Sequence, residues 1–461
     1  MTRKTKLFAA VVAALSAQAW AVPVDFHGYL RSGSGSGSEG GNVACFQINA
    51  PAFGGDVGRS GRLGNECDTY GELAFDAGLG ETMGIGFKLH TMVAFGSQQI
   101  QDYEQSVPAW RQAWIEATNV GSGALANATM WAGKRFYKRH DVHIADFFWS
   151  ADTGPGAGIE NVDLGMGGAK FSYALMRNGS ASFGNTGGNS NQDLLRATTI
   201  DNPGKAISNH DFRIEGIDVG MGSIDLGANF VLKNNGDTVT DIKDASGKVV
   251  GQSRKTIGGK GGVGLTVAHN YSNPFDLGGF NSFVFQYAND GANLDGTGKW
   301  WADENVKYRG WRVIEHLVFE PKGSDWNGAV FFGYGKERLY NESNGKLNWG
   351  DRKDSSTTTL VVRPVYHFNE AYSVAFEAGT TRVKPGTGDS YYLNKFTIAP
   401  QLSAGKGFWA RPVLRAYYTL ANWNKAAGNP AATGRDLGVE LPQYRGKTNG
   451  SSYGVQMEAW W

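Results

Sequence analysis

Residues 85–95, which read IGFKLHTMVAF, alternate between two kinds of side chain. One parity is mostly apolar and the other is small or polar: Ile85, Phe87, Leu89, Thr91, Val93 and Phe95 against Gly86, Lys88 and His90. Successive side chains of a strand point to opposite faces, so this period of two predicts a strand with one apolar and one polar face. Residues 223–232, 357–367 and 395–402 alternate in a similar way.

Such segments recur along the whole chain and are separated by clusters of Gly, Asn and Asp. Alternation over about 10 residues is typical of a strand that crosses a membrane in a barrel, with one face toward lipid and the other toward water. We count about 18 segments, an even number in the size range of barrels with a water-filled lumen. Their predicted starts lie near Val24, Thr69, Ile85, Ala109, Thr129, Ile159, Lys170, His210, Ser223, Gly261, Asn281, Lys307, Asn327, Thr357, Tyr372, Tyr392, Trp409 and Ser452.

The connections between segments are alternately long and short. Residues 32–59, 178–209 and 421–450 are long, polar and rich in Gly and Asn, whereas 368–371 is brief. Long outer loops and short periplasmic turns are typical of outer-membrane barrels. The chain ends on QMEAWW, and an alternating last strand suits pairing with the first strand, which leaves no open edge in lipid. We therefore predict an all-β fold, a transmembrane antiparallel β-barrel, rather than a soluble β-sandwich, which is usually much shorter.

The N-terminus has the parts of a secretory signal peptide. A basic start, MTRKTK, precedes an apolar run that ends in the small residues of Ala19-Trp20-Ala21. The run is shorter than the roughly 20 apolar residues that a spanning helix needs. We expect cleavage after Ala21, which leaves residues 22–461 as a single barrel domain in the outer membrane.

Composition narrows the class of protein further. The chain has 66 glycines but only 13 prolines among 461 residues, so its glycine content does not reflect a disordered Pro/Gly sequence. A formal net charge of +1 argues against a nucleic-acid partner, which usually leaves a strongly basic balance. Cys45 and Cys67 are the only cysteines, and in an exported protein a lone pair favours a disulfide over a zinc site.

Several blocks of sequence, in order along the chain, resemble the maltoporin family. They are 24–29 (VDFHGY), 62–67 (RLGNEC), 130–137 (MWAGKRFY), 139–143 (RHDVH), 154–158 (GPGAG), 279–281 (GFN), 408–412 (FWARP) and the closing QMEAWW. Long blocks in order are more specific than a short motif. The middle third and the loops diverge from the family.

The resemblance implies a homotrimer of 18-stranded barrels in outer-membrane lipid, each with its own channel for malto-oligosaccharides and with no cofactor or metal. It also implies a third loop that folds inward and narrows the pore. In the family a line of aromatic rings guides the sugar, and this line corresponds to Tyr103, Tyr70, Tyr29, Trp460, Trp409 and Phe280. A charged track beside it corresponds to Arg31, Arg62, Glu72, Arg111, Arg139, Asp141 and Asp146.

Two residues depart from the family at the predicted constriction. Phe148 stands where the family usually has tyrosine, and Ala151 stands where an acidic residue is expected. The narrowest point is therefore expected to be more apolar, which leaves open a less selective channel for other oligosaccharides or general solutes. A sucrose-type porin is related, but such porins carry an N-terminal extension before the barrel, whereas here we expect the signal peptide to run almost directly into the first strand.

Other interpretations of these residues remain open. Tyr29 and Trp460 suit an interfacial aromatic girdle as well as a lumen, and His140 with His143 has a spacing that occurs in metal sites. Glu72 and Asp146 are candidates for a glycosidase pair on a barrel enzyme, although no Ser/His arrangement of recognisable spacing accompanies them. The long loops also suit a receptor for a phage or another surface ligand.

Overall fold

The computed structural model describes residues 23–54, 56–99, 101–104, 106–178, 207–233, 235–244, 246–299, 302, 304–341, 354–428, 439 and 441–461. The predicted signal peptide, residues 1–21, and most of the predicted long loop 178–209 lie outside these ranges. Cleavage of the signal peptide after Ala21 and the bounds of the single barrel domain therefore stay predictions. Within the described ranges, no helix is long and apolar enough to cross a membrane.

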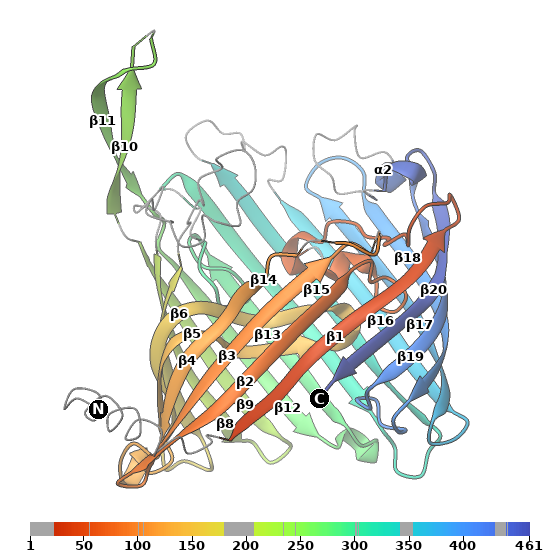
Figure 1. The fold of residues 1–461 in the computed structure, drawn as a ribbon, viewed down its shortest axis with the longest axis horizontal. Coiled ribbons are helices and arrows are strands. Elements are labelled where there is room, and N and C mark those ends of the chain that lie inside the picture. Colours follow the sequence, from red (N-terminus) through yellow and green to blue (C-terminus); the bar gives the residue numbers. More distant parts are fainter. Residues whose placement is uncertain are drawn as a thin grey trace, which may run out of the picture.

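An 18-stranded antiparallel sheet closes on itself and forms the barrel (Figure 1). Its strands are β1 (Val24–Gly37), β2 (Thr69–Thr82), β3 (Ile85–Ser97), β4 (Ala109–Thr118), β5 (Thr129–Val142), β6 (Phe147–Asp163), β7 (Lys170–Asn178), β8 (Ile207–Asp218), β9 (Ser223–Lys233), β12 (Gly262–Ser272), β13 (Phe280–Asn289), β14 (Val306–Phe319), β15 (Trp326–Asn341), β16 (Ser355–His367), β17 (Tyr372–Pro385), β18 (Tyr391–Ser403), β19 (Val413–Trp423) and β20 (Asn449–Trp460). Each strand pairs with its neighbour in this order, and β20 pairs with β1 with Tyr29 opposite Trp460. The predicted closure of last strand on first is confirmed.

Short elements lie in the connections. They are η1 (Pro51–Phe53), η2 (Asp56–Arg59), η3 (Gly123–Leu125), η4 (His143–Ala145), η7 (Pro274–Asp276), α2 (Lys425–Gly428) and η9 (Pro442–Tyr444). A separate hairpin of β10 (Asn235–Lys243) and β11 (Val249–Gly258) projects beyond one end of the barrel (Figure 1).

All eighteen predicted segments correspond to barrel strands, but several boundaries differ. The segment predicted from Trp409 begins at Val413, and β1 continues to Gly37, so the long loop predicted at 32–59 is observed at 38–68. The largest difference is in the sixth segment. We placed the start of the sixth segment near Ile159, whereas β6 begins at Phe147. The N-terminal part of β6 runs up to Gly154, Pro155 and Gly156. Its side chains are buried against the inward segments as well as within the wall, so buried and exposed residues do not alternate there and the sequence shows no period of two. The β10–β11 hairpin was not predicted.

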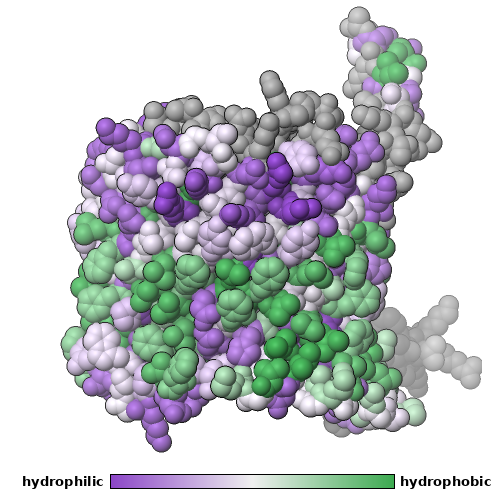
Figure 2. Space-filling view, turned by 180° about the vertical axis from the view of Figure 1, so that it is seen from behind, coloured by the Kyte–Doolittle hydropathy of each residue, from purple (hydrophilic) through white to green (hydrophobic). Residues whose placement is uncertain are grey.

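The two faces of the wall differ as the alternation predicts. Along β19, buried and exposed residues alternate without a break. Leu414, Tyr418 and Leu420 point outward, whereas Arg415 and Thr419 are buried in the interior. Figure 2 shows a mostly hydrophobic band across the face of the barrel wall in view, with hydrophilic residues above it toward the end that bears β10–β11. This band suits the apolar interior of a bilayer.

The first long connection, residues 38–68, folds into the barrel instead of staying outside. The Phe53 ring centroid lies 6.4 Å from that of Phe331 on β15 and 5.7 Å from that of Phe147, both in edge-on contact. Gly333 makes this approach possible, because a Cβ there would lie 2.8 Å from the Phe53 ring. The lumen is therefore partly filled by the protein's own chain.

The tip of the β5–β6 hairpin, which is the short third connection at this end of the barrel and the start of β6, also turns inward, as expected. It crosses to the opposite wall, where Arg312 of β14 donates a hydrogen bond to the Trp149 carbonyl at 3.1 Å. Arg312 donates another to the Ala52 carbonyl of the first connection at 3.0 Å. One buried guanidinium therefore fastens both inward segments to the wall. Asp295, in the connection after β13, also holds this tip, since its carbonyl accepts a hydrogen bond from the Ala151 amide at 3.0 Å.

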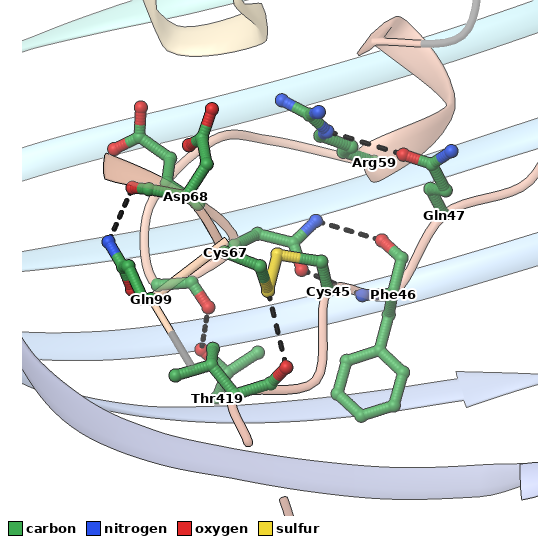
Figure 3. The surroundings of a disulfide bond; sticks show 12 residues. Cys45, Phe46, Gln47, Arg59, Cys67, Asp68, Gln99 and Thr419 are labelled. Carbon is green, nitrogen blue, oxygen red and sulfur yellow. Dashed lines mark hydrogen bonds between the residues drawn. A yellow bond between two sulfur atoms is a disulfide. The ribbon is translucent and has the colours of Figure 1, made fainter. Parts of the chain in front are cut away.

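The disulfide between Cys45 and Cys67 is present, and its two cysteines are 22 residues apart in the sequence. It closes most of the first connection into a loop inside the barrel (Figure 3). Beside it, the Asn65 side chain bonds both backbone groups of Phe46 at 2.8 Å, and Arg59 donates to Gln47 at 3.3 Å. The predicted bridge therefore braces a segment that occupies the lumen.

We expect replacement of Cys45 and Cys67 by serine to destabilise this segment. The bridge reduces the conformational entropy of the unfolded loop, which contributes roughly 3 kcal/mol to the stability of the folded segment. The channel of the double variant should show larger and noisier single-channel currents than the wild type, since the loose segment no longer fills the lumen steadily. Wild type treated with a reductant is the matched control. Unchanged conductance and noise in both would contradict a role for the bridge in shaping the pore.

Candidate functional site

A cavity of about 650 Å³ lies inside the barrel beside the inward segments. Most of the residues predicted for sugar binding line it, although they come from five strands and three connections. The lining residues are Tyr29, Arg31, Arg62, Tyr70, Glu72, Arg111, Phe136, Arg139, Asp141, His143, Asp146, Phe148, Trp409 and Trp460. The cavity therefore gathers all seven residues of the predicted charged track, four of the six predicted rings and Phe148.

Four aromatic rings form a continuous line along the cavity. Tyr70 and Tyr29 have ring centroids 6.2 Å apart, Tyr29 and Trp460 6.5 Å, and Trp460 and Trp409 6.4 Å. The pairing of β1 with β20 sets the central step, since it places Tyr29 directly opposite Trp460. These two residues face the lumen, so the girdle interpretation is wrong for them.

The other two predicted rings lie outside the lining of this cavity. Tyr103, in the connection after β3, is 76 % exposed and forms no part of the cavity wall. Phe280, the first residue of β13, packs edge-on against His316 at 5.2 Å and against a buried apolar cluster. Their predicted roles at the ends of the line stay predictions.

Arg31 and Arg62 belong to a buried network of ion pairs. Arg31 donates hydrogen bonds to Glu66 at 2.8 Å and to Asp146 at 3.3 Å. Arg62 donates to Glu66 at 2.5 Å and lies 3.0 Å from Glu458. Because these guanidiniums already have carboxylate partners, their main effect is to hold the first and third connections to the wall where β1 pairs with β20.

Glu458 is the point at which this network meets the ring line. It lies two residues before Trp460 on the same face of β20, where it accepts a hydrogen bond from the Tyr29 hydroxyl at 3.1 Å. Arg411 donates to Glu458 at 2.8 Å and stacks over the Trp460 ring at 4.1 Å. The rings are therefore held in place by charged groups behind them.

Sequence reasoning did not select Glu66, Glu458, Phe136 or Arg411, and it considered His143 only for metal. All five lie within the sequence blocks quoted above. For Glu458 a signal was available, because the period of two places it on the face of Trp460. For the others, only the folded contacts reveal the role.

Arg111 and Arg139 are different from the network arginines. Among the described residues, neither forms an ion pair. Arg139 stacks over Phe136 at 4.1 Å and over Phe148 at 3.7 Å, and Arg111 stacks over Phe136 at 4.9 Å. Their donors therefore remain available to a ligand in the cavity, and Arg139 Nε is buried without a hydrogen-bond partner.

Three acidic residues, Glu72, Asp141 and Asp146, line the cavity, and two of them have clearly different partners. Glu72 accepts a hydrogen bond from the Tyr70 hydroxyl at 2.6 Å, which joins the charged track to the ring line. Burial acts to raise the pKa of Asp146, but the positive charges of Arg62, Arg31 and Arg59 outweigh it and hold that pKa below its usual range. Asp146 is therefore a carboxylate committed to arginine.

His140 and His143, whose spacing also occurs in metal sites, contact other side chains of the protein. His140 stacks on Trp149, with ring centroids 4.3 Å apart, and Arg62 donates a hydrogen bond to His143 at 2.8 Å. Burial lowers the pKa of His143 to about 3, and Arg62 acts in the same direction, so the ring is neutral. Over the described part of the chain, no group of three His, Cys, Asp or Glu side chains is arranged to hold a metal ion.

Several solved structures are similar to this chain at low identity. The OpdL structure of Pseudomonas aeruginosa aligns over 95 % of this chain and 98 % of that chain, at 9 % identity and a TM-score of 0.45. An anion-selective porin from Comamonas acidovorans aligns over 95 % and 99 %, at 10 % identity and a TM-score of 0.41. The trimer form of OmpT, an outer membrane protein of Vibrio cholerae, aligns over 95 % and 99 %, at 8 % identity and a TM-score of 0.39. Likeness at this level transfers no residue role.

The comparison with protein families is far more specific. A family model described as LamB porin matches residues 24–461, which is the entire barrel from the first residue of β1 to the end of the chain. The match agrees with the sequence blocks, the closed barrel and the lumen cavity. This chain therefore belongs to the LamB porin family, the maltoporins, and is an outer-membrane porin.

Proposed function

We propose that this porin is a channel for the facilitated diffusion of maltose and maltodextrins. The observation that carries the proposal is the line Tyr70–Tyr29–Trp460–Trp409, which shares one cavity with the unpaired arginines Arg111 and Arg139. A sugar ring has an apolar C–H face and a rim of hydroxyls. The rings match the first, and the guanidiniums match the second.

Passage through a channel requires that each contact be weak and that similar contacts follow one another. Ring centroids 6.2–6.5 Å apart provide such a series, because a sugar chain can exchange one ring for the next without leaving the wall. The charged groups along the line compensate for the water that the hydroxyls lose. A single tight site would bind sugar but release it slowly.

A less selective oligosaccharide channel, or a sucrose-type or general solute porin, is the alternative. Phe148 favours it, because its ring packs 3.7 Å beneath Arg139 and offers no hydroxyl to a sugar at the constriction. Ala151 lies outside the lining of the main cavity and supplies no carboxylate there. These two residues affect how strongly the channel prefers one sugar, not whether rings and arginines meet it.

An enzymatic role has less support. A glycosidase pair needs one carboxyl that keeps its proton near neutral pH. Asp146 is paired with Arg31 and Arg59 at 3.3 and 3.2 Å, which favours its ionised form. Asp146 therefore does not suit the role of general acid in the candidate pair with Glu72, and a channel remains the better account.

The first prediction concerns the ring line. Replacing Tyr29 by alanine should weaken maltodextrin block of the single-channel current by about 0.5–1.5 kcal/mol beyond the loss of apolar area, since one stacking surface is missing. Tyr29→Phe should keep most of the block, because it keeps the ring and loses only the hydroxyl's bonds with Glu458 and Arg62. Tyr418→Ala, on the lipid side of β19, is the matched control and should leave block unchanged.

The dependence on sugar length tests the same line in the wild type. Block should strengthen from glucose to longer maltodextrins and level off once the rings are occupied. If glucose and a long maltodextrin block equally poorly, the general-porin alternative replaces the proposal. If only arginine variants lose affinity, the rings have a packing role instead.

The unpaired arginines give a second prediction. Arg139→Ala should reduce sugar block by roughly 1.5–3 kcal/mol at most, the value of a hydrogen bond to a charged group, and should raise ion conductance by widening the constriction. Arg31→Ala is the contrasting variant: it leaves Glu66 and Asp146 short of a partner and should lower the temperature at which the channel unfolds. Larger conductance with unchanged sugar affinity in Arg139→Ala would mean that this residue only shapes the lumen.

The third prediction concerns assembly. We expect a homotrimer whose subunits conduct independently. This expectation rests on the family resemblance alone, since no feature of the described residues by itself encodes threefold contact. Unheated gel migration or native mass spectrometry should give three times the monomer mass, and single insertions should open and block in three equal steps. A stable monomer in mild detergent would contradict the expectation.

A further inference from the structure

A second cavity, of about 440 Å³, adjoins the first on the other side of the constriction. Asp146 and Phe148 line both cavities, so the two meet at the tip of the β5–β6 hairpin. The remaining walls of the second cavity, which we call the side chamber, come from residues 51–54, the connection 293–299 and strands β14 and β15. Its volume falls within the range of about 300–1,000 Å³ that is usual for small-ligand pockets.

The side chamber offers the same kinds of groups as the main cavity. Lys299 and Tyr308, both more than nine-tenths buried, line it, with the Lys299 ammonium 3.4 Å from the Tyr308 ring centroid. Within the described part of the chain, no hydrogen bond is formed by the Tyr308 hydroxyl. The Asp295 carboxylate accepts hydrogen bonds from the Thr297 amide and hydroxyl, and among the described residues both reach its Oδ1. The Lys299 ammonium, the Asp295 carboxylate and the hydroxyl and ring of Tyr308 therefore supply a donor, an acceptor and an aromatic surface, and each can still contact a ligand.

The charges in the side chamber suit a neutral ligand. Three carboxylates, of Asp146, Asp295 and Glu337, face two cations, Lys299 and Arg312. Arg312 is committed to backbone carbonyls of the inward segments, and Asp146 is committed to arginines. An ion of either sign would meet opposing charges, whereas hydroxyl groups can bond both kinds.

Ala151 is what leaves this space open. Its methyl group lines the side chamber, and its amide is fixed by the Asp295 carbonyl at 3.0 Å. A longer acidic side chain at this position would project into the space. With alanine at position 151 instead of the expected acidic residue, the chamber has one carboxylate fewer and more space beside Phe148.

We infer that the side chamber is a second saccharide site, which takes a sugar unit that branches from a glucan chain lying on the ring line. The inference rests on the proposed function, since the main chain is held by the rings of the first cavity. The shared residues Asp146 and Phe148 keep the two sites contiguous, so one branched molecule can occupy both. A linear chain uses the ring line alone.

The test compares two isomeric tetrasaccharides as blockers of the single-channel current of the full-length channel. One is linear maltotetraose, and the other carries a glucose unit α-1,6-linked to the middle unit of maltotriose. In the wild type the branched isomer should block about 2- to 10-fold longer than maltotriose, which is its own main chain, the effect of one net hydrogen bond. Maltotetraose adds its fourth unit along the ring line instead and is the isomeric control. Ala151→Leu fills the chamber and should abolish this excess, and Tyr308→Phe should reduce it, while block by the linear isomer stays unchanged in both.

The outcomes separate the two proposals. Equal block by the branched isomer and by maltotriose in the wild type, or an excess over maltotriose that survives Ala151→Leu, overturns the second site and leaves the ring line intact. Absence of block by either isomer overturns the proposed function and the second site with it. Leu339→Phe fills the chamber from the opposite wall, so it replaces Ala151→Leu if that variant fails to assemble, and normal block by the linear sugar reports correct folding.

Discussion

The pairing of β1 with β20 is the interaction on which the rest of the structure depends. In lipid, a strand with unpaired amide and carbonyl groups is too costly, so a sheet of this kind must close. The closure also brings the two ends of the chain together at Tyr29 and Trp460. The same backbone bonds that remove the open edge therefore create the centre of the ring line.

Closure makes a space, and the chain then fills part of it. The first connection, braced by the Cys45–Cys67 bridge, and the third connection pack against the inner wall and against each other. Arg312 holds both, and Gly333 gives Phe53 room to approach the wall. The pore is consequently what remains after the inward segments have packed, so its width depends on contacts far apart in the sequence.

The division of the arginines follows from that packing. Arg31 and Arg62 meet Glu66, Asp146 and Glu458, and they stabilise the lumen wall. Arg111 and Arg139 meet aromatic faces instead of carboxylates, which leaves their donors directed to solutes. A channel needs both kinds: fixed charges to keep the constriction in shape, and unsatisfied donors for hydroxyls that have lost their water.

The sequence alone determined the barrel, the approximate positions of its strands, the disulfide and the family, because each depends on local pattern or on contiguous blocks. A period of two is visible in 85–95, and the start of β6 was misplaced where glycine and proline interrupt that period. Only the tertiary structure distinguished Arg139 from Arg31, drew Glu66 and Glu458 into the network, and left Tyr103 and Phe280 outside the cavity. Partners of a charge lie up to hundreds of residues away, as Glu458 does from Arg62, and their contact exists only once the barrel has closed.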